Sequence, residues 1–261
     1  MKSYKSNLYS GIGSLLLVAG ILITDTNVMA QQQDVDAITS QMKNASPSVR
    51  AKLVEILSEM GGPSVVAALV EALGDEASQV RREAADALGE IGDPRAVPAL
   101  MAAFQDNARD VRREVVESLG ELHDIRAVSV LIEALDDESS DVRREAVDAL
   151  GHMEDPAAIE RLQEALSDPN SEVRREAADA IGDIGGAAAV PALIQALQDG
   201  SSEVRREAAD ALTMMEQAEP EKVIPILVKG YVSEIGTARY NTGLQRRWDV
   251  YVFPPVKQSL H

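Results

Sequence analysis

The tetrapeptide Val-Arg-Arg-Glu recurs at one fixed spacing through most of the 261-residue chain. It begins at five positions, each 31 residues after the one before: Val80, Val111, Val142, Val173 and Val204. One further step back reaches Val49 and Arg50, which form a degenerate first copy. A fixed period of this kind is the signature of repeat architectures, in which each unit buries its apolar face against its neighbours. The repeat therefore constrains the fold more than any other feature of the sequence.

Each repeat predicts a pair of helices and no strand. The first helix carries an apolar stripe at helical spacing, formed in one copy by Val80, Ala84, Ala87, Leu88 and Ile91. A Gly-Asp-Pro turn at 92–94 follows, and a second apolar helix then ends in an acidic loop. Alanine-rich stripes let helices approach closely, which fits an aromatic content of only 3%. We therefore predict an all-α fold, an α-solenoid of about six helix-pair repeats.

Polar residues precede the first helix of several pairs. These helices are predicted to start near residues 49, 80, 111, 142, 173 and 204. Hydroxyl and amide side chains three residues before the valine are typical N-caps, because their oxygen accepts a free backbone N–H of the first turn. The candidates are Ser46, Ser139, Asn170 and Ser201.

The first 30 residues have the pattern of a secretory signal peptide. Lys2 and Lys5 precede an apolar stretch over 11–23, and a small-x-small site ends at Ala30. We expect cleavage after Ala30 and export to a bacterial periplasm or out of the cell. The alternative is an uncleaved anchor, which the short apolar stretch disfavours. Cysteine is absent, so disulfides, thiolate metal sites and cysteine nucleophiles are excluded.

The charge balance restricts the class of partner. The chain has 43 Asp and Glu against 25 Lys and Arg, a formal net charge of −18. Phosphate groups repel such a surface, so the sequence argues against nucleic acid and against anionic membranes. We expect protein partners, some of them basic. The sequence does not indicate an oligomeric state.

The repeat also resembles a known family. VRREAADALGEIGDPRAVPAL (80–100) and its copies are similar to HEAT repeats, in particular to the HEAT-like repeats of the phycobilisome-lyase type. The resemblance covers about residues 34–228 and implies a solenoid over 31–230, followed by an atypical tail over 231–261. It implies that the Val-Arg helices line the concave surface and that the other helices lie outside. The outer helices are expected near 34–44, 63–73, 95–105, 126–135, 156–166, 187–197 and 220–230.

The resemblance implies a structural ladder along one edge of the solenoid. In HEAT proteins an aspartate and an arginine at these repeat positions stack into such a ladder. Here the aspartates are Asp75, Asp106, Asp137, Asp168 and Asp199, and the arginines are Arg81, Arg112, Arg143, Arg174 and Arg205. Asn44 and Arg50 take the same places in the first copy, which predicts a weaker first rung.

Four rows of polar residues are expected on the concave surface, where solenoids bind their partners. The first row is Arg82, Arg113, Arg144, Arg175 and Arg206, and the second is Glu83, Glu114, Glu145, Glu176 and Glu207. The third row is Asp86, Glu117, Asp148, Asp179 and Asp210, and the fourth is Glu90, Glu121, His152, Asp183 and Met214. One interpretation is a solvated face laced by pairs such as Arg82 with Asp86. The other is a groove for a basic protein segment or a polyamine.

Catalysis has little support in the residues. Deoxyhypusine hydroxylase resembles these repeats but binds iron through His-Glu pairs, and here the matching positions read Arg-Glu, as at Arg82 and Glu83. Arginine stays protonated and does not ligate metals. None of the three histidines, His123, His152 and His261, precedes a glutamate. We expect no catalytic residue, no cofactor and no metal, and a scaffold as the function; the alternative is a hydroxylase-like or bilin-lyase-like enzyme.

The tail over 231–261 differs in composition from the repeats. Residues 229–261 contain five basic and two acidic side chains, and they hold most of the aromatic residues that follow Ala30. The candidate anchors are Trp248, Tyr251 and Phe253. We predict that this basic, aromatic tail docks on the acidic surface of its own chain or of a second copy; the alternative is a disordered terminus.

Overall fold

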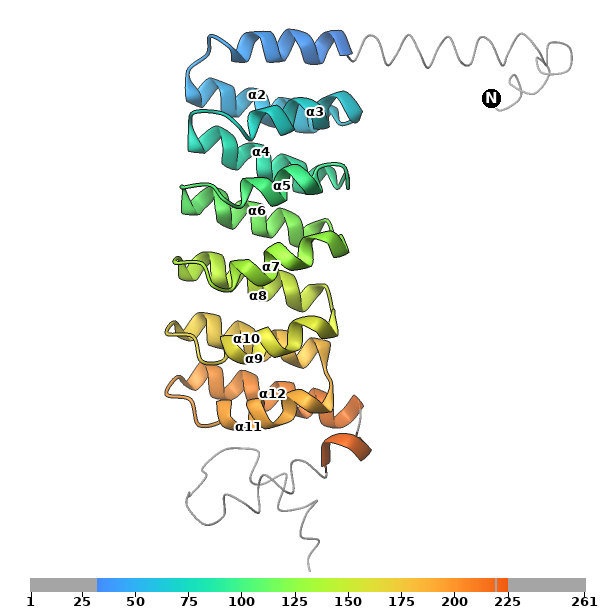
Figure 1. Ribbon diagram of the computed structural model, residues 1–261, viewed down its shortest axis with the longest axis vertical. Coiled ribbons are helices and arrows are strands. Elements are labelled where there is room, and N and C mark those ends of the chain that lie inside the picture. Colours follow the sequence, from blue (N-terminus) through green and yellow to red (C-terminus); the bar gives the residue numbers. More distant parts are fainter. Residues whose placement is uncertain (1–31, 219, 225–261) are drawn as a thin grey trace, which may run out of the picture. The chain divides into compact units, whose positions relative to one another are not determined.

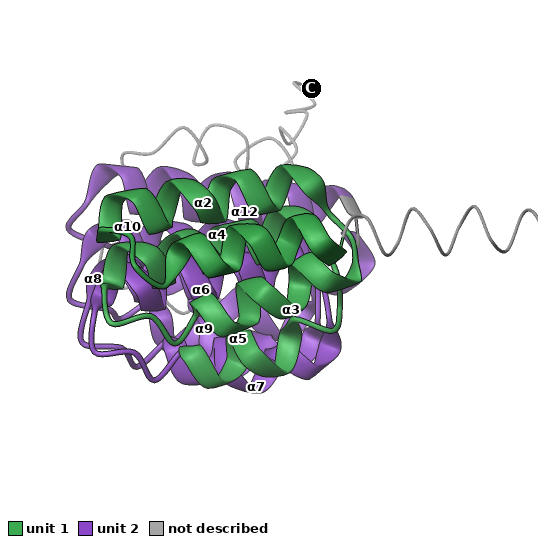
Figure 2. Cartoon of the chain, turned by 90° about the horizontal axis from the view of Figure 1, so that it is seen from above, with its two compact units in different colours: residues 1–103 green, residues 104–261 purple. Residues whose placement is uncertain are grey.

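The computed structural model describes residues 32–218 and 220–224. The expected signal peptide and the tail anchors lie outside these residues. The chain divides into two compact units, Met1–Ala103 and Phe104–His261, shown in two colours in Figure 2. The described parts are all helical and contain no strand, so the predicted fold class, an α-solenoid of helix pairs, is confirmed.

The first unit contains two repeats and the start of a third. A helix over 32–42 precedes α2 (Pro47–Met60), and α3 (Pro63–Ala72) leads to α4 (Ser78–Ile91) and α5 (Val97–Ala103). Inner helices α2 and α4 pack against each other, and α3 packs against both. Figure 2 shows α2 and α4 in one layer and α3 and α5 in the other.

The second unit continues the same alternation. Its inner helices are α6 (Arg109–Glu121), α8 (Ser140–His152), α10 (Ser171–Ile184) and α12 (Ser202–Ala218), and each packs on the next (Figure 1). Its outer helices are α7 (Val128–Ala134), α9 (Ile159–Ala165) and α11 (Val190–Ala196), each preceded by a short 3-10 turn. Residues 220–224 are also helical. Within the described residues, no helix combines the length and apolarity needed to cross a bilayer.

One large aliphatic side chain per helix builds the core. In the inner helices it is 0–1% exposed at every repeat: Leu57, Leu88, Leu119, Leu150, Ile181 and Leu212. The outer helices contribute a second fully buried set: Leu69, Leu100, Leu131, Leu162 and Leu193. Burial of each such side chain is worth about 1.5–3 kcal/mol relative to exposure. The apolar stripe read from the sequence is therefore the face on which the repeats pack.

Successive inner helices of the second unit touch through a glycine and an alanine. A Cβ built on Gly120 would lie 2.8 Å from the Ala149 Cβ, and one built on Gly151 would lie 2.7 Å from the Ala180 Cβ. Gly182 has the same relation to Ala211, at 2.8 Å. Real Cβ atoms do not approach this closely, so each glycine is needed for its helix to reach the next one.

The helix starts are capped differently from the prediction. The Asn170 side chain accepts a first-turn amide, that of Glu172 at 2.8 Å; Ser46 and Ser139 stand at the N-cap position without a capping hydrogen bond. The aspartate two residues before the N-cap instead accepts the amide of the N-cap residue, as Asp137 does from Ser139 at 2.8 Å. The prediction is wrong for both serines. At Ser139 the reason is that the upstream aspartate organises the turn.

Candidate binding surface on the inner helices

The ladder arginines reach from one repeat to the next. Arg112 donates to both carboxylate oxygens of Asp137, at 2.6 and 3.0 Å, and to the backbone carbonyl of Asp106 at 3.0 Å. Each guanidinium thereby joins two successive loops. The same bidentate pairing joins Arg50 to Asp75, Arg143 to Asp168, and Arg174 to Asp199.

The first rung is complete, which corrects the expectation of a weaker one. Arg50 donates to both oxygens of Asp75 at 2.7 Å and to the Ala45 carbonyl at 2.9 Å. Asn44 does not weaken the rung because Arg50 pairs forward, with the aspartate of the following repeat, as Arg112, Arg143 and Arg174 also do. The hydrogen bond from Arg174 lowers the pKa of Asp199, so this carboxylate is held in its ionised form.

The second row is not the exposed row that the sequence suggested. Glu114, Glu145 and Glu176 are only 5%, 8% and 8% exposed. Each follows an arginine on an inner helix and turns into the packing between successive inner helices. Burial is the largest cause that raises the pKa of Glu145 and of Glu176. These glutamates belong to the interior of the repeat stack, so the expectation of an open glutamate row is wrong.

The arginines of the first row form ion pairs with these buried glutamates. Arg175 pairs with Glu176 at 2.5 Å, with Glu207 of the next repeat at 3.6 Å and with Glu172 at 3.7 Å. Arg113 likewise lies 2.8 Å from Glu114 and 3.6 Å from Glu145, and it also pairs with Glu117. The arginines therefore form a second chain of ion pairs between repeats.

Some arginines of the first row pair with the adjacent glutamate and not, as predicted, with the acid four residues ahead. Arg82 pairs with the adjacent Glu83 at 3.0 Å, and Arg144 pairs with Glu145 at 3.3 Å. The spacing of four residues that was proposed for Arg82 and Asp86 is seen for Arg113 and Glu117, at 2.5 Å.

The third and fourth rows form the accessible part of the surface. In the third row Asp86, Glu117, Asp148 and Asp179 are half-buried and Asp210 is exposed. All members of the fourth row, Glu90, Glu121, His152, Asp183 and Met214, are exposed. His152 lies 3.5 Å from the Asp148 carboxylate. A partner would therefore meet mainly carboxylates, because the guanidinium groups of Arg113, Arg144 and Arg175 are already paired.

Several carboxylates lie close to Asp179 and raise its pKa. Burial is the largest cause that raises the pKa of Asp179, and Asp183 raises it further, while Arg175 lowers it. Around Glu176, the carboxylates of Asp148 and Asp179 raise the pKa as well. Acids on α8 and α10 thus interact with one another across the repeat boundary. Such a surface favours a bound cation, which would relieve this repulsion.

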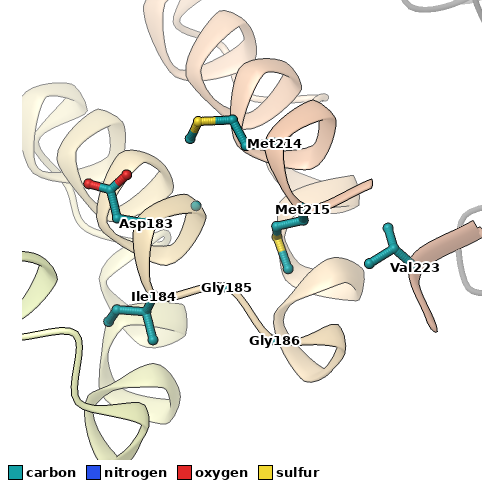
Figure 3. Close-up of a pocket in the computed structure, with 8 residues that line it drawn as sticks. Asp183, Ile184, Gly185, Gly186, Met214, Met215 and Val223 are labelled. Carbon is teal, nitrogen blue, oxygen red and sulfur yellow. The ribbon is translucent and has the colours of Figure 1, made fainter. Parts of the chain in front are cut away.

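A cavity of about 370 Å³ opens at the C-terminal end of the second unit. Met214, Met215 and Val223 line one side, and Asp183, Ile184 and a Gly-Gly turn line the other (Figure 3). The wall is thus mainly apolar with one carboxylate. The predicted tail anchors Trp248, Tyr251 and Phe253 lie outside the described residues, and their docking stays a prediction. Trp248 is the only tryptophan, so its fluorescence emission reports directly on whether the tail is docked.

The described residues offer no cluster of three or more His, Asp and Glu side chains arranged to hold a metal ion. His123 lies in a turn, where its φ is 48° and its Nδ1 is 2.9 Å from the Glu121 carbonyl oxygen. Gly92 occupies the equivalent place in another repeat, with φ of 68°. His123 therefore acts as a helix-end residue.

Two features of this surface were not predicted from the sequence. The burial of the second row depends on which side of the inner helix faces the next repeat, and the sequence alone does not say which side that is. The contact glycines Gly120, Gly151 and Gly182 carried a visible signal, because a glycine inside a helix is unfavourable unless another backbone approaches it closely.

The sequence matches the family model for HEAT repeats over three stretches, residues 35–120, 102–171 and 159–239. No curated protein matches it. The complex of CpcE and CpcF of phycocyanin lyase from Nostoc sp. PCC7120 is similar in structure, with 23% identity, a TM-score of 0.52, and 83% of this chain and 92% of that chain covered.

Two further solved structures are similar. A designed armadillo repeat protein in complex with the peptide (KR)4 has 24% identity and a TM-score of 0.51, and the match covers 69% of this chain and 98% of that chain. Human deoxyhypusine hydroxylase in complex with glycerol has 22% identity over 74% of this chain and 99% of that chain. Its TM-score of 0.39 is too low to carry an argument.

Proposed function

Because the chain belongs to the HEAT-repeat family, we propose that it is a scaffold without catalytic activity of its own. It is exported, and it binds a basic segment of a protein partner along the acidic rows of its inner helices. The proposal rests on one observation above all. Around Asp179, the carboxylates of Asp148 on α8 and Asp183 on α10 raise the pKa of Asp179 beyond the effect of its burial, so positive charge from a partner would relieve their mutual repulsion.

The periodicity of the rows suggests the shape of the ligand. The third row places a carboxylate at the equivalent position on α6, α8, α10 and α12, and the fourth row adds Glu121 on α6 and Asp183 on α10. A ligand that meets this pattern carries positive side chains at regular intervals, as an extended Lys- and Arg-rich peptide does. The similar armadillo repeat protein was solved with the peptide (KR)4, which is a peptide of this kind. That likeness concerns the fold alone, so the acid rows of this chain carry the proposal.

A titration with two synthetic peptides tests the proposal. We expect the purified protein to bind an octapeptide of alternating Lys and Arg, and not one of alternating Gln and Ser, in isothermal titration calorimetry at low salt. The double variant D179N/D183N should weaken the affinity by about tenfold, and raised salt should weaken it in the wild type. E160Q/E164Q removes the same charge from the outer helix α9 and should leave the affinity within about twofold. Equal losses in both double variants would exclude a specific site on the inner helices.

Acidification provides a second arm of this experiment. The cationic peptide binds the ionised, accessible carboxylates, and the pKa of Asp179 is raised, so this group becomes protonated at a higher pH than usual. The affinity should therefore fall as the pH drops, beginning above the usual carboxylate range near about 4. D179N should reduce this dependence. An affinity unchanged between pH 7.5 and pH 4 would contradict the proposal.

An enzyme of the hydroxylase or bilin-lyase type is the second candidate function. The family has enzyme members among its structural neighbours, as the phycocyanin lyase complex shows for its own chains. At the inner-helix positions this chain has Arg-Glu in place of His-Glu, and arginine does not ligate iron. Metal analysis of the purified protein separates the candidates: we expect no bound iron, and stoichiometric iron would favour the enzyme.

A further inference from the structure

Helix α2 carries an apolar stripe that the described part of the first unit leaves partly exposed. The stripe consists of Val49, Leu53, Ile56 and Met60, which recur at helical spacing along one side of the helix. Val49 is 48% exposed and Ile56 is 46% exposed. Leu53 and Met60 are half-buried. This stripe holds two of the most exposed large aliphatic side chains among the described residues.

The equivalent positions elsewhere are buried. Val49 corresponds to Val80, Val142 and Val173, which are 0–1% exposed. Ile56 corresponds to Ala87, Ala149 and Ala180, which are 3–5% exposed. In those repeats this side of the inner helix packs on the repeat before it, and α2 belongs to the first repeat. Terminal repeats of solenoids are usually polar on their outer side, so an apolar stripe here indicates a contact.

We infer that this stripe is the interface of a symmetric dimer, in which α2 of one copy packs antiparallel on α2 of a second copy. Charge complementarity along the edge of the stripe supports this occupant. Lys52, Glu55 and Glu59 lie on one edge, and the Lys52 and Glu55 side chains are 77% and 55% exposed. A twofold axis between Leu53 and Ile56 sets Lys52 of one copy level with residue 57 of the other, between the partner's Glu55 and the partner's Glu59.

Head-to-tail stacking of copies is blocked at the other end of the repeats. Inner helices of the second unit approach through glycine on one helix and alanine on the next. Thr213 of α12 stands where Gly120, Gly151 and Gly182 stand in earlier repeats, and Ile56 of α2 stands at the alanine position. A threonine opposite an isoleucine is too large for that approach. The contact therefore closes on itself as a dimer and does not propagate into a filament.

The interface is small, so the association should be weak. The stripe runs along one 14-residue helix, about 21 Å long at the usual helical rise. Such a face is smaller than the roughly 800 Å² per partner that stable complexes bury. We expect a dissociation constant in the micromolar range, on the order of 10–100 μM.

Sedimentation equilibrium of the purified protein over a wide concentration range tests the dimer. The wild type should show a monomer–dimer equilibrium, and V49D should weaken it at least tenfold. I125D is the matched control, because Ile125 is 67% exposed and lies in the second unit; it should leave the equilibrium unchanged. A wild type that stays monomeric at millimolar concentration would overturn the inference. A dimer that V49D does not weaken would also overturn it.

Charge exchange identifies the occupant as a second copy. K52E makes the whole edge negative, and E55K/E59K makes it positive, so each variant alone should be monomeric. An equimolar mixture of the two should form a heterodimer at least as tight as the wild-type dimer. Only a face that pairs antiparallel with itself predicts this restoration. A mixture that stays monomeric, while circular dichroism shows both variants folded, excludes the proposed pairing.

Discussion

Replacing Gly151 by alanine is expected to destabilise the protein, although the same change stabilises most helices. A Cβ at this position would lie 2.7 Å from the Ala180 Cβ and 3.1 Å from the Ala180 Cα, so α8 and α10 must move apart. Overpacking of this kind lowers the free energy of unfolding by about 1–3 kcal/mol. In an unhindered helix, the higher helix propensity of alanine would instead raise it by about 1 kcal/mol. Urea denaturation followed by circular dichroism measures the difference, and valine at this position should have a larger effect.

Two further variants control this experiment. Gly200 has no neighbouring atom within 4 Å of a built Cβ, so G200A should leave stability unchanged or raise it slightly. A180G alone should lower the free energy of unfolding, but in the G151A background it makes room for the new methyl group. The double variant should therefore lose less free energy of unfolding than the two single variants lose together. G151A as stable as the wild type would show that the two helices separate without penalty.

Replacing Arg112 by methionine should cause the largest loss of any ladder variant in the second unit. The Arg112 and Asp137 side chains are 9% and 6% exposed, which makes this the most buried of the ladder pairs within that unit. Methionine keeps much of the volume but leaves the Asp137 carboxylate buried without its cation. Removing one partner of a buried ion pair lowers the free energy of unfolding by about 3–5 kcal/mol. The Asp106 carbonyl also loses its donor.

An exposed pair in the same unit gives the control for this second prediction. Arg126 also makes a bidentate pair, with Asp124, but its side chain is 51% exposed and the partner is two residues away. R126M should therefore change the stability little, because exposed ion pairs contribute little. D137N added to R112M should recover part of the loss, since the buried charge is removed. Equal effects of R112M and R126M would show that burial of the ladder does not matter.

Much of the fold was predictable from the repeat, because its period fixes both the number of helices and the side that each one buries. The inner helices begin two residues before their valines, and Val80 and Leu88 of the stripe are fully buried while Ile91 at its end is half-buried. Helix ends were less predictable. Asp137 takes over the capping role expected of Ser139, and sequence spacing alone does not say which oxygen reaches a given amide.

The candidate surface was only partly predictable. Helical spacing predicts the four rows of polar residues. The second and third rows are three residues apart, so their side chains differ in direction by about 60° around the helix axis. This small rotation decides that Glu145 is buried between helices while Asp148 stays accessible. A sequence pattern with a period of 31 residues repeats such an ambiguity in every copy. The interior location of the glutamates followed only from the packing of one repeat on the next.

The forward reach of the ladder arginines has a consequence for how this protein can change over generations. Arg143 holds Asp168 and Arg174 holds Asp199, both 25 residues ahead, and the contact glycines follow the same register. Deletion of a single residue within a repeat would break the register of both sets of contacts at once. Duplication or excision of a whole 31-residue unit would recreate each of them with a new neighbour. The repeat, and not the single residue, is therefore the smallest length of chain that can be gained or lost without harm.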